Sequence, residues 1–377
     1  MKKKTKEDGV DVKITKDDIQ QQALSTILAN KRCTCALSMG VGKTYLGLQY
    51  LKYLQYLSKN KKLQILIVAP KKTVIQSWKD EATKFNIEGI LENVVFSTYL
   101  SLSKQTIDFD VIILDECHNL LFSHDDYLKN VNSKILGLTG TPPRYTDSEK
   151  GWMVNKYCPV KFEYLTDDAV GDNILNDYKI YVHYLKLNSN KELEVTYKSG
   201  SFMTSEVANY IYWTGRVDDA RPGKSKQIAS VMRMKAIMEY SSKEEYAKEL
   251  FNQQTDKCIL FCNTQAQADK LCSHSYHSKN PDNEENLIKF KDGIITKISC
   301  VLQLSEGVNI PNLKSGIIMH SYGNERKSSQ RIGRMMRLNP EETAIIHILC
   351  YENTVDEFWV KSALKDYDQS KITHLKN

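Results

Sequence analysis

The chain has 377 residues, of which 41% are hydrophobic and 26% are charged, which is enough for two or three globular domains. This balance excludes a mainly disordered chain, and 17 glycines and 8 prolines are too few for a collagen-like or low-complexity protein. Lysine and arginine outnumber aspartate and glutamate by 52 to 46, and a net charge of +6 permits a nucleic-acid partner without requiring one.

The sequence carries no sign of a membrane partner or of export. Its most apolar stretch, residues 63–69, has the length of a strand and not of a membrane span. The first residues are lysine-rich and polar, unlike a secretory signal. Nine cysteines at irregular positions indicate reduced thiols. We therefore expect a cytoplasmic protein.

The amino-terminal part is predicted to be a tail followed by a helix. Residues 1–12 are expected to form a flexible basic tail. Thr15 and Asp18 then have the spacing of a capping box, and apolar residues recur at helical spacing over residues 19–28. The sequence therefore predicts that a helix begins just after Thr15.

Short apolar strands then alternate with amphipathic helices, a pattern typical of a parallel sheet covered on both faces. In the first half we expect strands at residues 33–37, 63–69, 94–97, 111–114 and 135–138. In the second half we expect them at 178–187, 258–262, 298–302, 316–320 and 344–349. The prediction is an α/β protein with a first domain over 13–180 and a second over 181–377, in which 188–250 forms a partly helical crossover or insertion.

A glycine-rich segment after the first strand predicts a phosphate-binding loop. Gly40, Val41 and Gly42 precede Lys43 and Thr44, which open a helix. Glycines let backbone N–H groups turn toward phosphate oxygens, and the helix N-terminus adds its positive dipole end. Lys43 is expected to reach the β- and γ-phosphates of ATP, while the Thr44 hydroxyl ligates Mg²⁺.

Two acidic residues follow the strand expected at 111–114. Carboxylates at the carboxyl end of a parallel strand face the ligand crevice of such sheets. We expect Asp115 to hold Mg²⁺, directly or through water, and Glu116 to orient and deprotonate the attacking water.

With these residues in place, the sequence resembles superfamily 2 helicases and translocases over residues 14–351. Residues 115–118 (DECH) resemble motif II of the DExH type, and residues 139–142 (TGTP) resemble motif III. The resemblance implies two tandem RecA-like domains with the ATP site in the cleft between them. It also implies that Gln20 reads the adenine base.

Two segments of the first half resemble those that contact nucleic acid in this superfamily, residues 68–78 and 97–99. The contacts that the resemblance implies are Pro70, Lys71, Trp78, Thr98 and Tyr99.

Two further motifs lie in the second half. Residues 305–311 resemble motif V and residues 330–337 resemble motif VI, which implies nucleotide contacts from Gly307, Asn309 and Gln330. Arg334 and Arg337 are three residues apart and so share one helix face. By resemblance they are the arginine fingers that reach the γ-phosphate from the second domain.

The motif III sequence TGTP differs from the Ser-Ala-Thr of DEAD-box RNA helicases. Together with residues 76–78 (QSW) and 98–99 (TY), it resembles Swi/Snf-type translocases, type III restriction subunits and phage branch-migration helicases. This resemblance implies a bacterial or phage-infected cell. We therefore expect an ATP-dependent DNA helicase or translocase, acting on branched or forked DNA in replication, recombination or repair. A DExH-type RNA helicase and the motor subunit of a restriction-type complex remain alternatives. The expected partners are DNA in preference to RNA and replication or recombination proteins, and the expected state is a monomer.

Overall fold

The computed structural model describes residues 14–38, 40–58, 62–143, 146–197, 200–301, 310, 312–321, 342–365 and 367–376. These residues form two compact units, which meet along the chain between Asp177 and Tyr178. Each unit has its own sheet and its own hydrophobic core. Among the described residues, no helix combines the length and the apolar character needed to cross a membrane.

The first unit contains a six-stranded sheet in the order β3-β2-β4-β5-β1-β6, and every neighbouring pair is parallel. Its inner strands are short and apolar on both faces, and β2 and β4 are buried at every position. The strands are β1 (Arg32–Leu37), β2 (Ile65–Ala69), β3 (Val94–Thr98), β4 (Val111–Asp115), β5 (Lys134–Thr139) and β6 (Val160–Tyr164).

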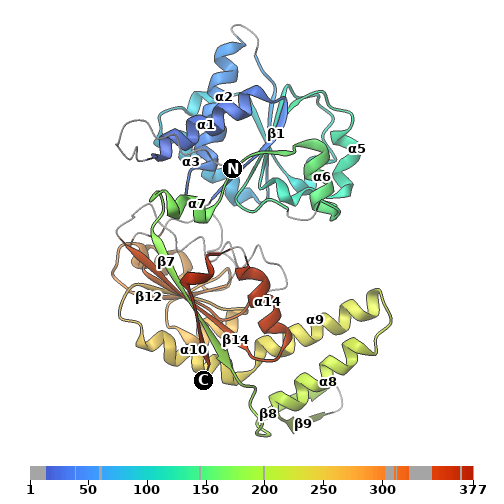
Figure 1. Cartoon of the computed structure of the whole chain (residues 1–377), viewed down its shortest axis with the longest axis vertical. Coiled ribbons are helices and arrows are strands. Elements are labelled where there is room, and N and C mark those ends of the chain that lie inside the picture. The colour runs from blue at the N-terminus through green and yellow to red at the C-terminus, as the bar shows by residue number, and fades with distance from the viewer. Residues whose placement is uncertain are drawn as a thin grey trace. The chain divides into compact units, whose positions relative to one another are not determined.

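Helices cover both faces of this sheet, as a parallel sheet requires. In Figure 1, α1, α2 and α3 lie on one side of the strands, and α5 and α6 lie on the other. Thr15 and Asp18 form the expected capping box at the start of α1. The helices are α1 (Lys16–Ala29), α2 (Lys43–Leu57), α3 (Lys72–Lys84), α4 (Tyr99–Leu102), α5 (Asp125–Leu128), α6 (Glu149–Tyr157) and α7 (Thr166–Gly171).

The strand order brings the predicted site residues to one edge of the sheet. Strand β5 pairs with β4 on one side and with β1 on the other. Because the three strands are parallel, the segments that follow Leu37, Asp115 and Thr139 leave the sheet side by side. This is the edge at which α/β sheets bind ligands.

The second unit is built on a seven-stranded sheet in the order β11-β12-β10-β13-β14-β7-β15. Its described helices include α10 (Ser241–Gln253), α11 (Gln265–Leu271), α12 (Asn283–Lys291) and α14 (Val355–Leu364). The strands are β7 (Asp177–Leu185), β10 (Cys258–Phe261), β11 (Ser275–Tyr276), β12 (Lys297–Cys300), β13 (Ser315–Ile318), β14 (Thr343–Tyr351) and β15 (Ile372–Lys376).

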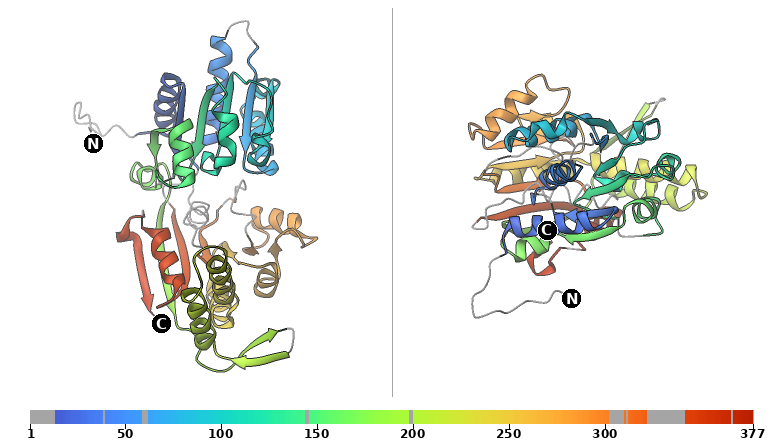
Figure 2. Two further views of the ribbon diagram at one scale, coloured as in Figure 1. Left: turned by 90° about the vertical axis from the view of Figure 1, so that its right-hand side faces the viewer. Right: turned by 90° about the horizontal axis from the view of Figure 1, so that it is seen from above.

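Residues 188–250 add a substructure to the second unit. A two-stranded antiparallel ribbon, β8 (Leu193–Tyr197) with β9 (Gly200–Thr204), precedes helices α8 (Glu206–Asp218) and α9 (Lys224–Glu239). The two helices pack against each other and extend away from the sheet of their own unit, as Figures 1 and 2 show.

The predicted α/β fold with two sheets is confirmed, and each of the ten expected strands coincides with an observed one along all or most of its length. Strands β6, β11 and β15 and the β8–β9 ribbon were not predicted from the sequence. The tail at 1–12 and the motifs at 305–309 and 330–337 lie outside the described residues.

Candidate nucleotide site

The loop between β1 and α2 has the backbone geometry of a phosphate-binding loop. Gly40 and Gly42 have φ angles of +88° and +98°, which favour glycine over residues with a side chain. A Cβ atom on Gly42 would lie 2.5 Å from Nε2 of Gln20, so a side chain at that position would displace its neighbour. Lys43 begins α2 immediately after the loop. The loop therefore keeps an open backbone at a helix N-terminus, which suits a nucleotide phosphate.

Helix α1 presents two side chains to this loop. The Gln20 amide nitrogen donates a hydrogen bond of 2.8 Å to the carbonyl oxygen of Val41, and Gln20 is only 7% exposed. Lys16 lies one helical turn earlier, and its Nζ is 3.5 Å from the position that a Cβ on Gly42 would occupy. Lys16 is not among the site residues predicted from the sequence, although its spacing of four residues from Gln20 places both on one helix face.

Lys43 and Glu116 form an ion pair, with 3.3 Å between Nζ and Oε1. Burial tends to raise the pKa of Glu116, but the charge of Lys43, followed by that of His118, outweighs burial and the pKa is lowered. Glu116 is therefore ionised at neutral pH and able to accept a proton. Its φ of +53° is unusual for a residue with a side chain and places a strained turn directly after β4.

Asp115, the last residue of β4, is 5% exposed. Burial, followed by the neighbouring charge of Glu116, raises the pKa of its carboxyl group. The Trp78 indole opposes this shift because it donates a hydrogen bond of 2.8 Å from Nε1 to Asp115 Oδ2. A carboxylate at this depth is costly without a partner cation. Together with the Thr44 hydroxyl, it offers the oxygen ligands that Mg²⁺ prefers.

A hydroxyl at the end of β5 links Glu116 to the segment after that strand. Thr139 Oγ1 donates to Glu116 Oε2 at 3.1 Å and lies 2.8 Å from His118 Nδ1. The same oxygen accepts a hydrogen bond of 3.1 Å from the backbone nitrogen of Thr141. A movement of residues 139–141 would therefore move the Glu116 carboxylate.

The predicted nucleic-acid contacts divide into two groups. Lys71 is exposed, and Pro70 and Thr98 are partly exposed. Trp78 is fully buried, and its ring lies beside Gly47, where a Cβ would be 2.4 Å from Cη2. Tyr99 is 6% exposed, and its hydroxyl donates to the backbone oxygen of Asp115 at 2.9 Å.

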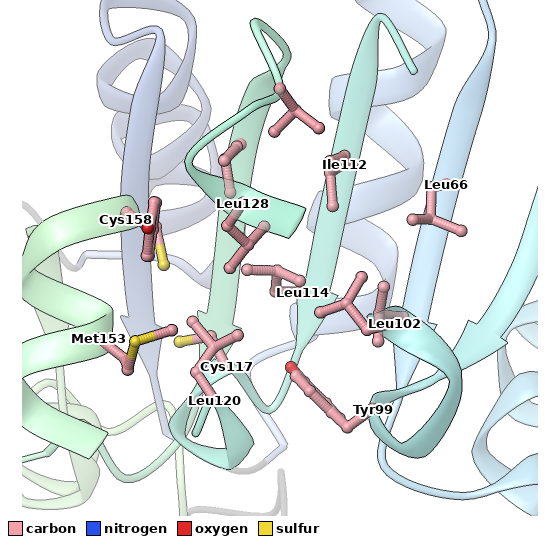
Figure 3. Close-up of a cluster of buried hydrophobic side chains, with 14 of the residues drawn as sticks. Leu66, Tyr99, Leu102, Ile112, Leu114, Cys117, Leu120, Leu128, Met153 and Cys158 are labelled. Atoms are coloured by element: carbon pink, nitrogen blue, oxygen red, sulfur yellow. The ribbon is translucent and has the colours of Figure 1, made fainter. Parts of the chain in front are cut away.

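These positions correct the expectation that Trp78 and Tyr99 face a nucleic-acid strand. Figure 3 shows Tyr99 among buried side chains of the first unit, close to Leu114 and Leu102. Both aromatic residues support the strand that carries Asp115. The cause is the register of their elements, because the apolar face of α3 and the first turn of α4 turn toward the sheet.

Five predicted site residues lie outside the described part of the chain. They are Gly307, Asn309, Gln330, Arg334 and Arg337. The described geometry therefore covers the half of the predicted site that belongs to the first unit.

Two family models match the chain. Residues 13–144 match "Type III restriction enzyme, res subunit", and residues 242–339 match "Helicase conserved C-terminal domain". The first match contains the loop at 38–44 and both acidic residues, and the second contains the segment with Arg334 and Arg337.

A curated protein is similar along most of its length. The DNA 3'-5' translocase XPB2 of Sulfurisphaera tokodaii is 23% identical over 368 residues, which covers 89% of this chain and 82% of that protein.

Solved structures share the fold at low sequence identity. The ATP-dependent Type ISP restriction-modification enzyme LlaBIII, bound to DNA, matches with a TM-score of 0.63 and 17% identity over 95% of this chain. The chain spans 31% of that enzyme's length. A putative HsdR subunit of a type I restriction enzyme from Vibrio vulnificus YJ016 matches with a TM-score of 0.59 and 18% identity over 96% of this chain and 67% of that one. S. cerevisiae Dbp5, bound to RNA and ADP BeF3, matches with a TM-score of 0.56 and 13% identity over 95% and 89%.

Proposed function

We propose that this chain, which belongs to superfamily 2 of the helicases and translocases, hydrolyses ATP in order to move along DNA. The observation that carries the proposal is that Glu116 contacts both Lys43 and Thr139, at the carboxyl ends of three adjacent strands. In this proposal Lys43 binds phosphate, Glu116 is the base, and Thr139 connects Glu116 to the backbone of Thr141. These contacts can couple ATP hydrolysis to a change in the position of residues 139–141.

In the proposed reaction, the residues of the first unit bind and orient the nucleotide. Backbone N–H groups of residues 40–44 and the Lys43 ammonium hold the phosphates, and Glu116 accepts a proton from the attacking water. Thr44 and Asp115 would hold Mg²⁺, which neutralises phosphate charge when it is bound. The lowered pKa of Glu116 keeps this carboxylate available as a base at neutral pH.

We assign the arginine-finger role to Arg334 and Arg337, and nucleotide contacts to Gly307, Asn309 and Gln330. The support is their place in a segment that matches the helicase C-terminal model. A guanidinium group presents a planar set of donors to phosphate oxygens, which a lysine does not. An arginine finger contributes about 10³- to 10⁵-fold to the rate in related NTPases.

The choice of DNA over RNA is supported by the relatives. The curated relative is named a DNA translocase. Among the solved structures with this fold, the restriction enzyme was bound to DNA and Dbp5 to RNA, so the choice rests on the curated relative. In this chain, the exposed Lys71 follows β2 and the partly exposed Thr98 ends β3, and these two strands are neighbours in the sheet. We propose that this part of the surface contacts the phosphate backbone without reading base sequence.

The test is ATPase activity with single-stranded, duplex, forked and four-way DNA, each compared with RNA of the same form. DNA should stimulate the wild-type chain more than RNA does, and stimulation should fall as salt rises. Lys43→Ala should abolish ATP binding or turnover, and Glu116→Gln should bind ATP without hydrolysing it. Arg334→Ala should bind ATP but lose stimulated turnover. Stimulation by RNA alone would overturn the DNA assignment, and normal turnover by Glu116→Gln would remove the proposed base.

A second candidate is the motor part of a restriction-type complex, because residues 13–144 match a restriction subunit model. This function requires a nuclease partner. Purification of the full chain from its native cell, followed by assay for ATP-dependent DNA cleavage, separates the two. Cleavage in the co-purified fraction would favour the restriction motor, whereas stimulated ATPase without cleavage would favour an independent translocase.

A further inference from the structure

The segment that ends the first unit packs against the phosphate-binding loop. Residues 172–177 follow α7 and lead directly into β7, the first strand of the second unit (Figure 1). Leu175 in this segment is 1% exposed, and its Cδ2 lies 3.2 Å from the position that a Cβ on Gly40 would occupy. Among the described residues, apart from the chain neighbours of Gly40, no other residue lies within 4 Å of that position. The Leu175 side chain therefore touches the backbone of the loop itself.

Residues 172–175 form a fixed turn after α7. The backbone nitrogens of Ile174 and Leu175 both donate hydrogen bonds to the carbonyl oxygen of Ala169, at 2.8 Å and 3.0 Å. Asn173 has a φ of +54°, a left-handed conformation that is common just after a helix. These bonds tie the backbone at Leu175 to α7. A displacement of the Leu175 side chain is therefore passed to the whole turn, since a close-packed contact leaves no space to absorb it.

The loop is also held at its first residue, by contacts that do not involve Leu175. The backbone nitrogen of Ser38 donates to the carbonyl oxygen of Tyr164 at 2.8 Å, and Ser38 Oγ lies 3.0 Å from Thr166 Oγ1. Ser38 is 2% exposed, so both contacts are shielded from water. They fix the start of the loop against the end of β6 and the start of α7. The contact between Leu175 and Gly40 is thus not needed to keep the loop in place.

We propose that Leu175 is a positioning residue that couples the phosphate-binding loop to the chain entering the second unit. When phosphate binds and the backbone at Gly40 shifts, Leu175 moves residues 172–177 with it. The inference rests on the proposed function, since it requires that the loop at 38–44 binds ATP. Coupling of this kind is reciprocal, so a movement imposed on residues 172–177 also changes the affinity of the loop for the nucleotide.

The test is hydrogen–deuterium exchange of the full chain, followed by mass spectrometry of peptides that contain residues 169–176. Exchange is compared with and without saturating Mg²⁺ and AMP-PNP, an ATP analogue that is not hydrolysed. The amides of Ile174 and Leu175 exchange when their bonds to Ala169 open, so they report movement of the turn. In the wild type, the analogue should change their exchange rate about fivefold or more, a typical size for coupling between two sites.

Leu175→Ala should separate binding from coupling. Because the contacts of Ser38 remain, its dissociation constant for AMP-PNP, measured by calorimetry, should stay within about threefold of the wild type. The exchange response at residues 169–176 should be lost. In ATPase assays the KM for ATP should likewise be retained, while the DNA-stimulated kcat should fall about fivefold or more.

A matched control is Ile174→Ala, which removes a buried side chain with the same number of carbon atoms from the neighbouring position. Ile174 does not touch Gly40, so this variant should keep the exchange response. Leu175→Met retains an apolar side chain of similar volume and should restore the response. Thermal unfolding identifies the folded variants. If Leu175→Ala does not fold, Leu175→Val takes its place and should show a weaker response, since its side chain is one carbon shorter.

Three results would overturn the inference while leaving the ATPase proposal in place. The first is a wild type that binds AMP-PNP with no change in exchange at residues 169–176. The second is a folded Leu175→Ala protein that keeps the response. The third is an equal loss of response in Ile174→Ala, which would reveal general loosening of the turn. A wild type that does not bind AMP-PNP would instead overturn the proposed function itself.

Discussion

The indole nitrogen of Trp78 donates a hydrogen bond to the carboxylate of Asp115, with 2.8 Å between Nε1 and Oδ2. The resemblance to superfamily 2 helicases implies a nucleic-acid contact at Trp78, and the place of Asp115 at the end of a strand predicts a metal ligand; neither feature links the two residues. In the structure, α3 brings the indole beneath β4, where it supports the proposed metal ligand. The segment at 70–78 therefore connects exposed Lys71 at one end to the nucleotide site at the other.

Replacement of this indole should weaken the proposed metal site. In Trp78→Phe, Asp115 loses its donor, so its pKa rises further and protons compete more strongly with Mg²⁺. We expect the Mg²⁺ concentration for half-maximal ATPase to increase, most at acidic pH. The buried acceptor and the smaller ring should also cost about 2 to 4 kcal/mol of unfolding free energy.

The control for this variant is Trp152→Phe, since Trp152 is 41% exposed and makes no contact with Asp115. Chemical denaturation and Mg²⁺ titrations should both leave Trp152→Phe close to the wild type. An unchanged Mg²⁺ requirement in a folded Trp78→Phe protein would contradict the role assigned to the indole.

Asp115→Asn should stabilise the protein in the absence of nucleotide. The pKa of Asp115 is raised in the folded state, so at neutral pH the buried carboxylate costs stability relative to the unfolded chain. Removal of the charge should increase the unfolding free energy by about 1 to 3 kcal/mol above the folded-state pKa. This gain should shrink as the pH falls, and disappear below about pH 4, where the carboxyl is protonated in both states.

The measurement is thermal unfolding from pH 4 to pH 8, with and without Mg²⁺ and ATP. The variant should unfold at a higher temperature without ligands but lose the stabilisation that Mg²⁺ and ATP give the wild type. Asp108→Asn, which changes an exposed carboxylate, is the control and should show neither effect. A destabilised Asp115→Asn at neutral pH would contradict the electrostatic account of this residue.

The sequence predicted those strands well that are buried on both faces, because such strands are continuous apolar runs. Strands β2 and β4 are apolar at nearly every position because helices cover both faces, so short apolar runs identify them. Strand β15 could not be found in this way, because it is half exposed and pairs with β7, about 190 positions earlier in the chain. The β8–β9 ribbon likewise lacks a buried face that would set its pattern.

The sequence predicted which positions belong to the candidate site, but not which of their side chains are buried. The motif spacing located Lys43, Asp115 and Glu116, since each follows a strand whose end is visible in the sequence. The resemblance implies a nucleic-acid contact at Trp78 but does not show which side of α3 faces the sheet, and the structure buries this side chain. Lys16 was missed because a lysine on an amino-terminal helix resembles any solvated residue.

Loss of the Thr139 hydroxyl should separate nucleotide binding from stimulated turnover. Thr139→Val keeps the shape of the side chain but removes the donor to Glu116 and the acceptor for the backbone of Thr141. We expect an unchanged ATP dissociation constant and a loss of about tenfold or more in DNA-stimulated ATPase, since one hydrogen bond to a charged group is removed. Thr141→Val, whose hydroxyl is 3.5 Å from His118, should have a smaller effect. Full DNA stimulation of the ATPase in Thr139→Val would show that the hydrogen bond between Thr139 and Glu116 is not needed for stimulation.

The second unit depends on a buried ion pair between Lys243 of α10 and Asp356 of α14. Both side chains are almost completely inaccessible, at 0% and 2% exposure. The Asp356 carboxylate also accepts from the backbone nitrogen of Tyr351, and the Lys243 ammonium lies 4.5 Å from the centre of the Tyr351 ring. Lys243→Met leaves the Asp356 charge buried without its cation, which should cost about 3 to 5 kcal/mol of unfolding free energy.

Lys289→Met provides the comparison, because Lys289 and Glu285 form an ion pair on α12 whose side chains are 39% and 62% exposed. Exposed pairs contribute about 1 kcal/mol or less, so this variant should unfold close to the wild type. Calorimetric unfolding of the full chain should show that Lys243→Met lowers the transition of the second unit and leaves nucleotide-dependent stabilisation of the first unit in place. Equal stability of the two variants would mean that water reaches the Lys243 pair, and that α10 and α14 are held together by their apolar contacts alone.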